Sequence, residues 1–354
     1  MTSLFRVLRT AAMVGVSVVL AACGGDAPDG SSEAATGVRL AGAGATFPDP
    51  LYQEWIRRYR DQAPDVRIRY QPVGSGEGVA RFLAETVDFG GSDRAMTDAE
   101  MAQVVRGARL IPATAGMVVL AYNLPEIDGE LRLPRDVYVD IFLGTIWRWD
   151  DPRIQAANPD LELPSKMIQT VVRRDGSGTT YAFTNHLSAV SDAWRYGPGT
   201  GQSVQWPGGA MTGSGNEGVA QKIKISPGSI GYVEYYFARR LEMPIAMLEN
   251  RAGRFVRPDA ATGQAALASA AAAELPDNLR LFVPDPSGSD DYPIVSLSWL
   301  LLYGEYPDTE VGESLKAAVN WALDQGQEIA EEMGYIPLPE AIAAAAVEAV
   351  ASIR

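Results

Sequence analysis

The sequence has few of the side chains on which many enzymes and metalloproteins depend. Its 354 residues include one cysteine, Cys23, and one histidine, His186. A single cysteine excludes a disulfide within the chain, and one cysteine with one histidine excludes a zinc site in practice. A site in which carboxylates hold Mg²⁺ or Ca²⁺ stays open on composition, although no calcium-loop pattern of acidic residues occurs. We expect no cofactor and no metal.

The residues for nucleophilic catalysis are also sparse. Ser75, Ser177 and Ser214 lie in glycine turns, but none occupies a Gly-x-Ser-x-Gly elbow. His186, the one histidine that could serve as a base, falls on an expected helix where a surface position is the default. The sequence therefore favours a binding protein over an enzyme.

The first 22 residues have the pattern of an export signal. Arg6 and Arg9 precede an apolar run at residues 11–22, which is shorter than the ~20 residues of a membrane span. Leu20-Ala21-Ala22-Cys23 resembles the lipobox of bacterial lipoproteins, in which the cysteine becomes the lipidated first residue. An export signal that happens to contain a cysteine is the alternative. Residues 23–37 contain no aromatic residue and are predicted to be a flexible tether.

Strand-like and helix-like segments alternate in the first third of the chain. Strands are expected at residues 38–44, 66–70, 87–93 and 116–122, and helical spacing of apolar residues begins at Leu51 and Val79. Residues 97–100, Thr-Asp-Ala-Glu, have the form of a capping box. This alternation predicts an α/β fold with a parallel sheet and with ligands at the carboxyl ends of its strands.

Three glycine turns should lie on one edge of that sheet. They are residues 42–47, 74–78 and 90–93, and each follows an expected strand and precedes an expected helix. Taken singly, each turn is explained more simply as a tight connection without a ligand. Residues 213–220 repeat the pattern of residues 74–80, which indicates a similar helix start rather than an internal repeat.

Two apolar strands are expected to connect two domains. Residues 116–122 would lead out of the first domain and residues 293–303 would return to it. We predict domain I at residues 38–116 plus 296–354 and domain II at residues 117–295, with a hinge around a cleft. Further helices are expected at three places, namely an alanine-rich surface helix at residues 260–274 and covering helices at residues 313–323 and 339–353.

The stretch from Arg173 to Thr180 gives the clearest indication of a ligand. Glycines lead into a helix that would begin at Ser177 or Thr179, where free backbone N–H groups and the helix dipole favour an anion. Arg173 would add a planar charged fork for two oxygens of an oxyanion, and Asp175 could hold that fork in place. A strand, a turn and an ordinary capped helix also fit these residues.

Six segments, in order over nearly the whole length after residue 37, resemble the phosphate-binding protein of Pst-type ABC importers. They are residues 41–48 (AGAGATFP), 74–76 (GSG), 86–93 (TVDFGGSD), 172–179 (VRRDGSGT), 230–235 (IGYVEY) and 334–339 (GYIPLP). The resemblance implies a type II periplasmic-binding-protein fold, in which two α/β domains close on one inorganic phosphate. It also implies delivery of that phosphate to ABC permease subunits with their cytoplasmic ATPase.

The resemblance also implies a set of phosphate ligands. These are Thr46, Phe47 through its backbone N–H, Ser75, Asp93, Arg173, Asp175, Ser177, Gly178 and Thr179. The arginine of the family lies two residues before the aspartate, so the spacing selects Arg173 over Arg174. Arg94 differs from the family pattern, in which a small residue follows the aspartate. Its positive charge leaves open how acidic the mouth of the cleft is.

A buried Asp93 would explain a preference for phosphate. Phosphate near neutral pH keeps at least one proton that Asp93 could accept, whereas sulfate has none and would meet the carboxylate without a donor. Another tetrahedral oxyanion, arsenate or sulfate, remains the alternative ligand. An extracytoplasmic phosphate-ester hydrolase remains the alternative from another class.

The resemblance and the export signal together imply a place outside the cytoplasm. We expect a monomer in the periplasm or at the outer face of the cytoplasmic membrane, attached to the membrane only through lipid on Cys23. The formal net charge of −14 becomes −16 once residues 1–22, with two arginines and no acidic residue, are removed. This acidity argues against nucleic acid and anionic lipid as partners.

Overall fold

The computed structural model describes residues 37–272 and 276–354. The chain from Gly37 to Arg354 forms one compact unit. The predicted signal at residues 1–22, Cys23 and the tether up to residue 36 lie outside the described residues, as do residues 273 and 274 of the predicted alanine-rich helix. Within the described ranges, no helix has the length and apolar character needed to cross a membrane.

An eight-stranded sheet runs through this unit in the order β2-β1-β3-β11-β4-β8-β6-β7. Its strands are β1 (Val38–Gly44), β2 (Val66–Pro72), β3 (Phe89–Ser92), β4 (Ala108–Tyr122), β6 (Gln169–Arg173), β7 (Met211–Gly213), β8 (Ser229–Glu234) and β11 (Val295–Tyr303). Pairing is parallel within β2-β1-β3 and within β8-β6-β7, but antiparallel at β3-β11, β11-β4 and β4-β8. The expected parallel arrangement therefore holds only toward the two ends of the sheet.

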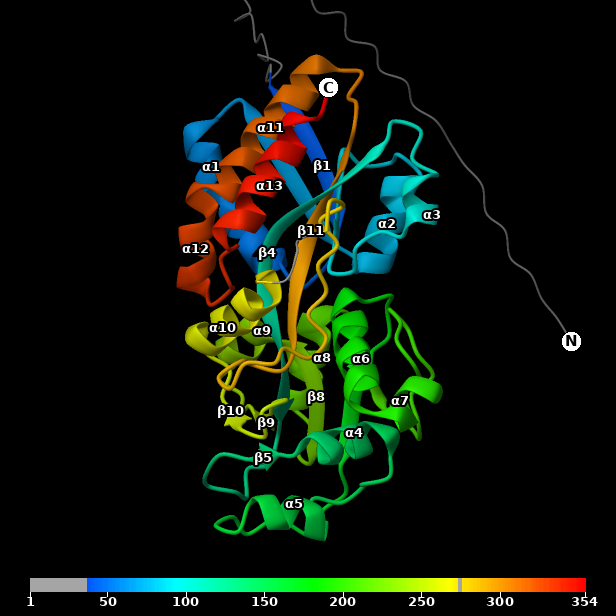
Figure 1. Ribbon diagram of the computed structural model, residues 1–354, viewed down its shortest axis with the longest axis vertical. Helices are drawn as coiled ribbons and strands as arrows, with labels where there is room; N and C mark the ends of the chain where they lie inside the picture. The colour runs from blue at the N-terminus through cyan, green and yellow to red at the C-terminus, as the bar shows by residue number, and fades with distance from the viewer. Residues whose placement is uncertain (1–36, 273–275) are drawn as a thin grey trace, which may run out of the picture. The chain divides into compact units, whose positions relative to one another are not determined.

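A three-stranded sheet and helices complete the unit. The small sheet has the order β10-β9-β5 and consists of β5 (Arg132–Leu133), β9 (Met247–Glu249) and β10 (Phe255–Val256). The helices are α1 (Asp49–Gln62), α2 (Ser75–Leu83), α3 (Asp98–Met101), α4 (Arg135–Leu143), α5 (Pro152–Ala157), α6 (Gly178–Val190), α7 (Asp192–Tyr196), α8 (Gly215–Lys224), α9 (Tyr235–Arg240), α10 (Ala260–Ala271), α11 (Thr309–Leu323), α12 (Gln325–Met333) and α13 (Glu340–Ala351). Figure 1 shows α1, α11, α12 and α13 gathered beside β1 and β4.

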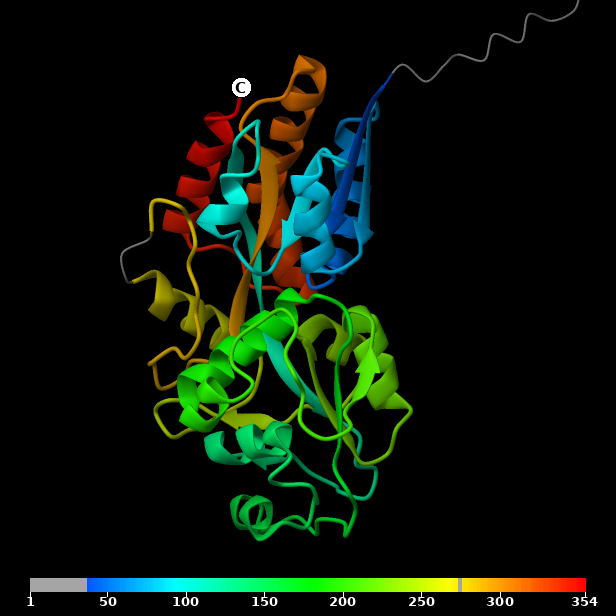
Figure 2. The ribbon, with the colours of Figure 1, turned by 90° about the vertical axis from the view of Figure 1, so that its right-hand side faces the viewer.

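The long strands β4 and β11 occupy the centre of the sheet. They pair from Ala108 opposite Tyr303 to Met117 opposite Val295, and both views show them side by side (Figures 1 and 2). The last residues of β4 then pair with β8, so β4 belongs to both halves of the sheet. The proposed domain boundaries fall in these two strands, and the division itself stays a prediction.

Strand β4 begins earlier than the sequence indicated. We expected it to start at Gly116, after Pro112, but it begins at Ala108 and runs through the proline. The register shifts between Ser298 and Trp299, which face Thr114 and Pro112, so Ala113 is an extra residue on β4. A bulge of this kind tolerates a proline because the ladder is already interrupted there.

Several local predictions are confirmed. The helix expected from Leu51 is α1, and it buries Leu51, Tyr52, Trp55 and Tyr59 at the predicted spacing. Thr97 and Glu100 form the predicted capping box, because the Thr97 side chain accepts from the Glu100 N–H and the Glu100 carboxylate accepts from the Thr97 N–H. These local features need few long-range contacts, which explains why sequence spacing predicted them.

Candidate functional site

The starts of α1, α2, α6 and α8 meet where the two halves of the sheet adjoin, and Figure 1 shows α2 above α6 and α8. The N–H of Gly76 in α2 donates to the carbonyl of Gly176, just before α6, at 2.9 Å. The N–H of Asn216 in α8 donates to Oγ1 of Thr46, just before α1, at 3.2 Å. Each helix start presents N–H groups without partners inside the helix, so their convergence favours an anion.

Arg173 lies at the end of β6 with its side chain 1% exposed. Its Nε donates to Oδ1 of Asp175 at 3.0 Å, its Nη2 donates to Oδ2 of the same carboxylate, and its Nη1 donates to Oγ1 of Thr179 at 3.2 Å. A guanidinium has five N–H donors, so one hydrogen on each Nη is left for a ligand. The predicted contact, in which the Asp175 carboxylate holds the Arg173 guanidinium in place, is thus present.

The pKa of the Asp175 carboxyl is consistent with this contact. Burial raises the pKa of the Asp175 carboxyl, but the hydrogen bonds and charge of Arg173 and the N–H of Gly215 outweigh it and hold the pKa below its ordinary value. Asp175 is therefore ionised at neutral pH. A carboxylate that keeps its charge can hold the guanidinium in one orientation.

Asp93 lies at the end of β3 and is 2% exposed. Its Oδ1 accepts from Ser298 at 2.8 Å, its Oδ2 accepts from Ser75 at 3.3 Å, and its N–H donates to the Ser75 hydroxyl at 3.1 Å. Burial raises the pKa of the Asp93 carboxyl to about 7, although the bonds from the two serines and the charge of Arg173 act in the opposite direction. Asp93 can therefore either accept or donate a proton near neutral pH.

Gly178 brings the two halves of the site into direct contact. A Cβ on Gly178 would lie 2.5 Å from Cβ of Asp93 and 2.5 Å from Oγ of Ser75, closer than real Cβ atoms approach. Only glycine fits at this first position of α6 while the contact is kept. Ser177 caps the same helix, since its Oγ accepts from the Thr180 N–H at 3.0 Å, and this confirms the predicted helix start.

Thr46 and Thr179 are joined by a residue that the sequence prediction missed. Nδ2 of Asn216 lies 3.1 Å from Oγ1 of Thr46 and 3.1 Å from Oγ1 of Thr179. Ser298 was missed as well. The repeated glycine pattern at residues 213–220 and the polar serines within an apolar strand at residues 293–303 were signals for these two residues.

The remaining predicted residues lie around this centre. Phe47 is fully buried, its carbonyl accepts from the Tyr335 hydroxyl at 2.9 Å, and α1 begins two residues later. Arg174 is exposed and donates to the Ser214 hydroxyl at 2.7 Å. Arg94 is buried and pairs with Glu100 at 2.7 Å, so its charge is balanced locally. The nine predicted ligands thus lie on the converging helix starts and strand ends.

His186 is not at a surface position, and our expectation for it was wrong. It is fully buried in α6, where Nδ1 contacts the carbonyl of Pro284 at 2.7 Å and Nε2 contacts the Tyr138 hydroxyl at 2.8 Å. A carbonyl only accepts, so Nδ1 carries the hydrogen and Nε2 accepts from Tyr138. Burial lowers the pKa of His186 to about 4, so the ring is neutral at neutral pH.

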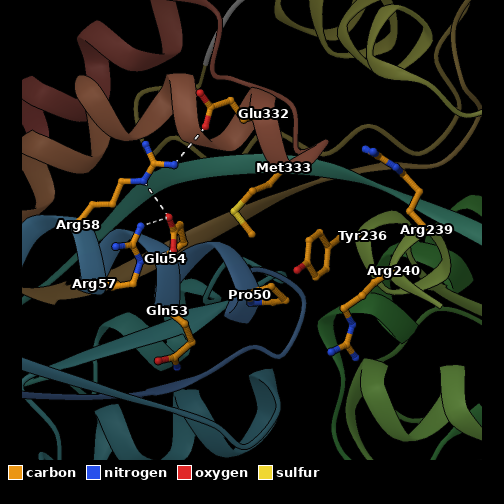
Figure 3. A pocket seen from close by; sticks show the side chains of 10 residues that line it. All are labelled: Pro50, Gln53, Glu54, Arg57, Arg58, Tyr236, Arg239, Arg240, Glu332 and Met333. Atoms are coloured by element: carbon orange, nitrogen blue, oxygen red, sulfur yellow. Dashed lines mark hydrogen bonds and ion pairs between the residues drawn. The ribbon is translucent and has the colours of Figure 1, made fainter. Parts of the chain in front are cut away.

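A wide groove lies elsewhere, between α1, α9 and α12 (Figure 3). It encloses about 600 Å³ and contains none of the predicted ligands. Figure 3 shows Arg58 between Glu54 and Glu332, which it contacts at 2.8 and 3.2 Å, with Arg239 and Arg240 projecting from α9 on the opposite side. Most of its arginines are paired with carboxylates, so its volume does not make it the anion site.

The described residues contain no group of three or more His, Cys, Asp or Glu side chains that could hold a metal ion. The polar groups that converge at the helix starts are mostly donors: guanidinium N–H groups, hydroxyls and backbone N–H groups. Such donors, together with the buried carboxyl of Asp93, suit an oxyanion that carries a proton.

Comparison by sequence finds relatives over most of the chain. Residues 30–325 match the family model described as the PBP superfamily domain. The chain is 40% identical over 304 residues to the phosphate-binding protein PstS of Pasteurella multocida strain Pm70, covering 86% of this chain and 87% of that protein. It is 35% identical over 362 residues to the phosphate-binding protein PstS of Methanocaldococcus jannaschii, covering 95% of this chain and 92% of that protein.

Comparison by structure finds the same fold. A high-affinity periplasmic phosphate-binding protein solved with bound phosphate matches with a TM-score of 0.72 and 22% identity, over 87% of this chain and 92% of that one. A phosphate-binding protein from Stenotrophomonas maltophilia matches with a TM-score of 0.66 and 21% identity, over 88% of this chain and 93% of that one. The expected α/β periplasmic-binding-protein fold is thereby confirmed.

Proposed function

Because this chain belongs to the family of phosphate-binding proteins PstS within the PBP superfamily, we propose that it binds one inorganic phosphate outside the cytoplasm and delivers it to an ABC importer. The observation that supports this most is the convergence of Arg173, Thr46, Thr179 and Asp93 at one point. Three of these residues supply hydrogen-bond donors, and the fourth is a buried carboxyl that can accept the proton of phosphate.

Selectivity would come from Asp93. When Asp93 is ionised, phosphate can donate its proton to the carboxylate, whereas sulfate would place an unprotonated oxygen against it. Leaving a buried acceptor unpaired costs roughly 1 to 3 kcal/mol, and more when it is charged. We propose that this difference makes phosphate the preferred ligand over sulfate. Arsenate carries a proton as phosphate does, so Asp93 would not reject it by this route.

The binding step can be tested by calorimetric titration. We expect saturable binding of one phosphate per chain and much weaker binding of sulfate at the same pH. Tighter binding of sulfate than of phosphate would overturn the assignment. Turnover of a chromogenic phosphate ester, measured with and without a divalent metal, tests the hydrolase alternative, and we expect none above the rate without protein.

The partners and location are part of the same proposal. Lipid on Cys23 would anchor the chain as a monomer at the outer face of the cytoplasmic membrane, where the permease subunits could receive the phosphate. Intact mass of the mature protein tests the lipid directly, because acylation adds the mass of fatty chains at residue 23. A Cys23→Ser variant should appear in the soluble periplasmic fraction instead of the membrane fraction.

A further inference from the structure

Asn216 uses both hydrogens of its side-chain amide at the centre of the site. It is fully buried near the start of α8. One Nδ2 hydrogen reaches Thr46 Oγ1 at 3.1 Å and the other reaches Thr179 Oγ1 at 3.1 Å. Thr46 belongs to predicted domain I and Thr179 to predicted domain II, so a single amide joins the two predicted domains.

The orientation of that amide is fixed by its other end. The backbone N–H of Glu234, at the end of β8, donates to Oδ1 of Asn216 at 3.0 Å. A backbone N–H can only donate, so the atom that faces it must be the amide oxygen. The NH₂ group is therefore held toward the two threonines, because a flip of the amide would place its N–H donors against the N–H of Glu234 and break that contact.

The hydrogens of the two threonine hydroxyls are thereby directed away from the protein. A hydroxyl oxygen accepts up to two hydrogen bonds and donates one. Thr46 Oγ1 accepts from the N–H of Asn216 at 3.2 Å and from its Nδ2, and Thr179 Oγ1 accepts from Nδ2 and from Nη1 of Arg173 at 3.2 Å. In every hydrogen bond that these two oxygens make with the described residues, the threonine oxygen is the acceptor. Each hydroxyl is left with its own hydrogen to donate.

We propose that Asn216 is a positioning residue that forces both Thr46 and Thr179 to act as donors toward the bound anion. The inference rests on the proposed function, since the acceptor for both hydroxyls is the phosphate. Asn216 would thus favour an anion without touching it, because it makes the two hydroxyls donate toward the ligand. It also links closure to binding, because the amide can bridge both threonines only when the two sides of the cleft are together.

The sharpest test is Asn216→Asp, which keeps the shape and the bond from Glu234. The introduced second oxygen only accepts, so both hydroxyls would turn their hydrogens to it and away from phosphate. Each hydrogen bond to a charged group is worth about tenfold or more, so we expect phosphate affinity to fall at least about 100-fold. Asn250→Asp is the matched control: Asn250 is also fully buried and fully hydrogen-bonded, at the end of β9, and its variant should bind phosphate within about twofold of wild type.

A pH series separates positioning from a purely structural role. Protonation of the introduced carboxyl restores one O–H donor, so the affinity ratio of Asn216→Asp to wild type should recover as the pH falls. The ionisable groups around this position are Arg173 at the end of β6, Asp175 two residues later, Asp93 directly after β3 and Glu234 at the end of β8. Burial raises the pKa of Glu234 well above its ordinary value, and all four groups are common to both proteins. Asn250→Asp should show no such recovery, and its absence in Asn216→Asp would contradict the positioning role.

The outcomes also distinguish this inference from the proposed function. If the wild-type chain fails to bind phosphate, the proposed function is wrong. If wild type binds and Asn216→Asp binds within about threefold of it, the function stands and the inference is wrong. Asn216→Ala adds no charge, and it provides a second test if Asn216→Asp does not fold. We expect about a tenfold loss for it, and unchanged phosphate affinity in this variant would also overturn the inference.

Discussion

Ser298 donates a hydrogen bond of 2.8 Å to Oδ1 of Asp93 across 205 residues of sequence. Asp93 directly follows β3, and Ser298 lies on β11, which is inserted between β3 and β4 in the sheet. The carboxyl is therefore fixed from one side by β11, and its other oxygen faces Ser75 and the start of α2. An acid held in this way can present one oxygen to a ligand without rearrangement.

Replacement of Asp93 should weaken discrimination between phosphate and sulfate. In Asp93→Asn the amide can turn an N–H toward sulfate, which removes the unpaired acceptor that opposes it. We expect the preference for phosphate to fall by about tenfold or more, in line with the 1 to 3 kcal/mol cost of an unsatisfied buried group. Competitive titration of phosphate against sulfate measures this, and an unchanged ratio would remove the role given to Asp93.

The two adjacent arginines should behave differently. Arg173→Ala removes a buried guanidinium and leaves Asp175 without its partner, and truncation of one member of a buried charge pair typically costs about 2 to 5 kcal/mol. We expect a loss of phosphate affinity of at least about 30-fold. Arg174→Ala removes only an exposed contact with Ser214 and should change the affinity less than about threefold. The opposite pattern in calorimetry would place the anion on Arg174.

Asp93 should make the ligand-free protein less stable as the pH rises from about 4 to 7. Its folded pKa of about 7 exceeds the ordinary value of 3.8, so the folded state binds more protons in that interval and stability is lost on deprotonation. Between pH 5 and pH 8 the Asp93 contribution is about 3 kcal/mol. Urea unfolding at both pH values should show this decrease in wild type and a smaller one in Asp93→Asn. An equal decrease in the free energy of unfolding in wild type and in Asp93→Asn would contradict this prediction.

The contact at Gly178 should be needed for binding rather than for folding. In Gly178→Ala the new Cβ would clash with Asp93 and Ser75 unless the two sides of the site separate. Overpacking costs of about 1 to 3 kcal/mol imply a loss of phosphate affinity of roughly tenfold or more with little change in the unfolding midpoint. Gly218→Ala is the control, because its Cβ would come no closer than 3.5 Å to any neighbour. Equal affinities for the two variants would refute a close approach at Gly178.

The single histidine gives a clean spectroscopic prediction. With its pKa lowered to about 4 by burial, the His186 ring should stay neutral and show no titration between pH 5.5 and pH 8. Its nitrogen shifts should indicate the tautomer with hydrogen on Nδ1, which faces the Pro284 carbonyl. A midpoint near the ordinary value of 6.5 in NMR would show that the ring is accessible to water.

Sequence spacing predicted local structure better than long-range arrangement. The alternation from β1 to α3 and the capping box at Thr97 follow from periodicity and turn residues, which act over a few positions. The placement of β11 between β3 and β4 depends on packing between segments about 200 residues apart, so no local pattern contains it. The start of β4 was misplaced for a related reason, because the bulge at Ala113 accommodates Pro112 only within the paired sheet.

The same division holds for the site. The glycine motif after β6 and the resemblance indicated Arg173, Asp175 and Ser177. Arg173 contacts Asp175 and Ser177 caps the helix that follows it, so these contacts lie within a few residues. Asn216 and Ser298 act through partners in distant segments, so their roles became visible only when the strands and helices were assembled. His186 was assigned to a surface because only one buried face was expected for α6, whereas α6 is buried on several sides.

A crystal structure with bound phosphate tests the central claim most directly. We predict phosphate oxygens within about 2.7 to 3.2 Å of the free N–H groups of Arg173, of Oγ1 in both Thr46 and Thr179, and of one Asp93 oxygen. Phosphate bound instead in the arginine-lined groove of Figure 3, with these residues free of ligand, would contradict the account.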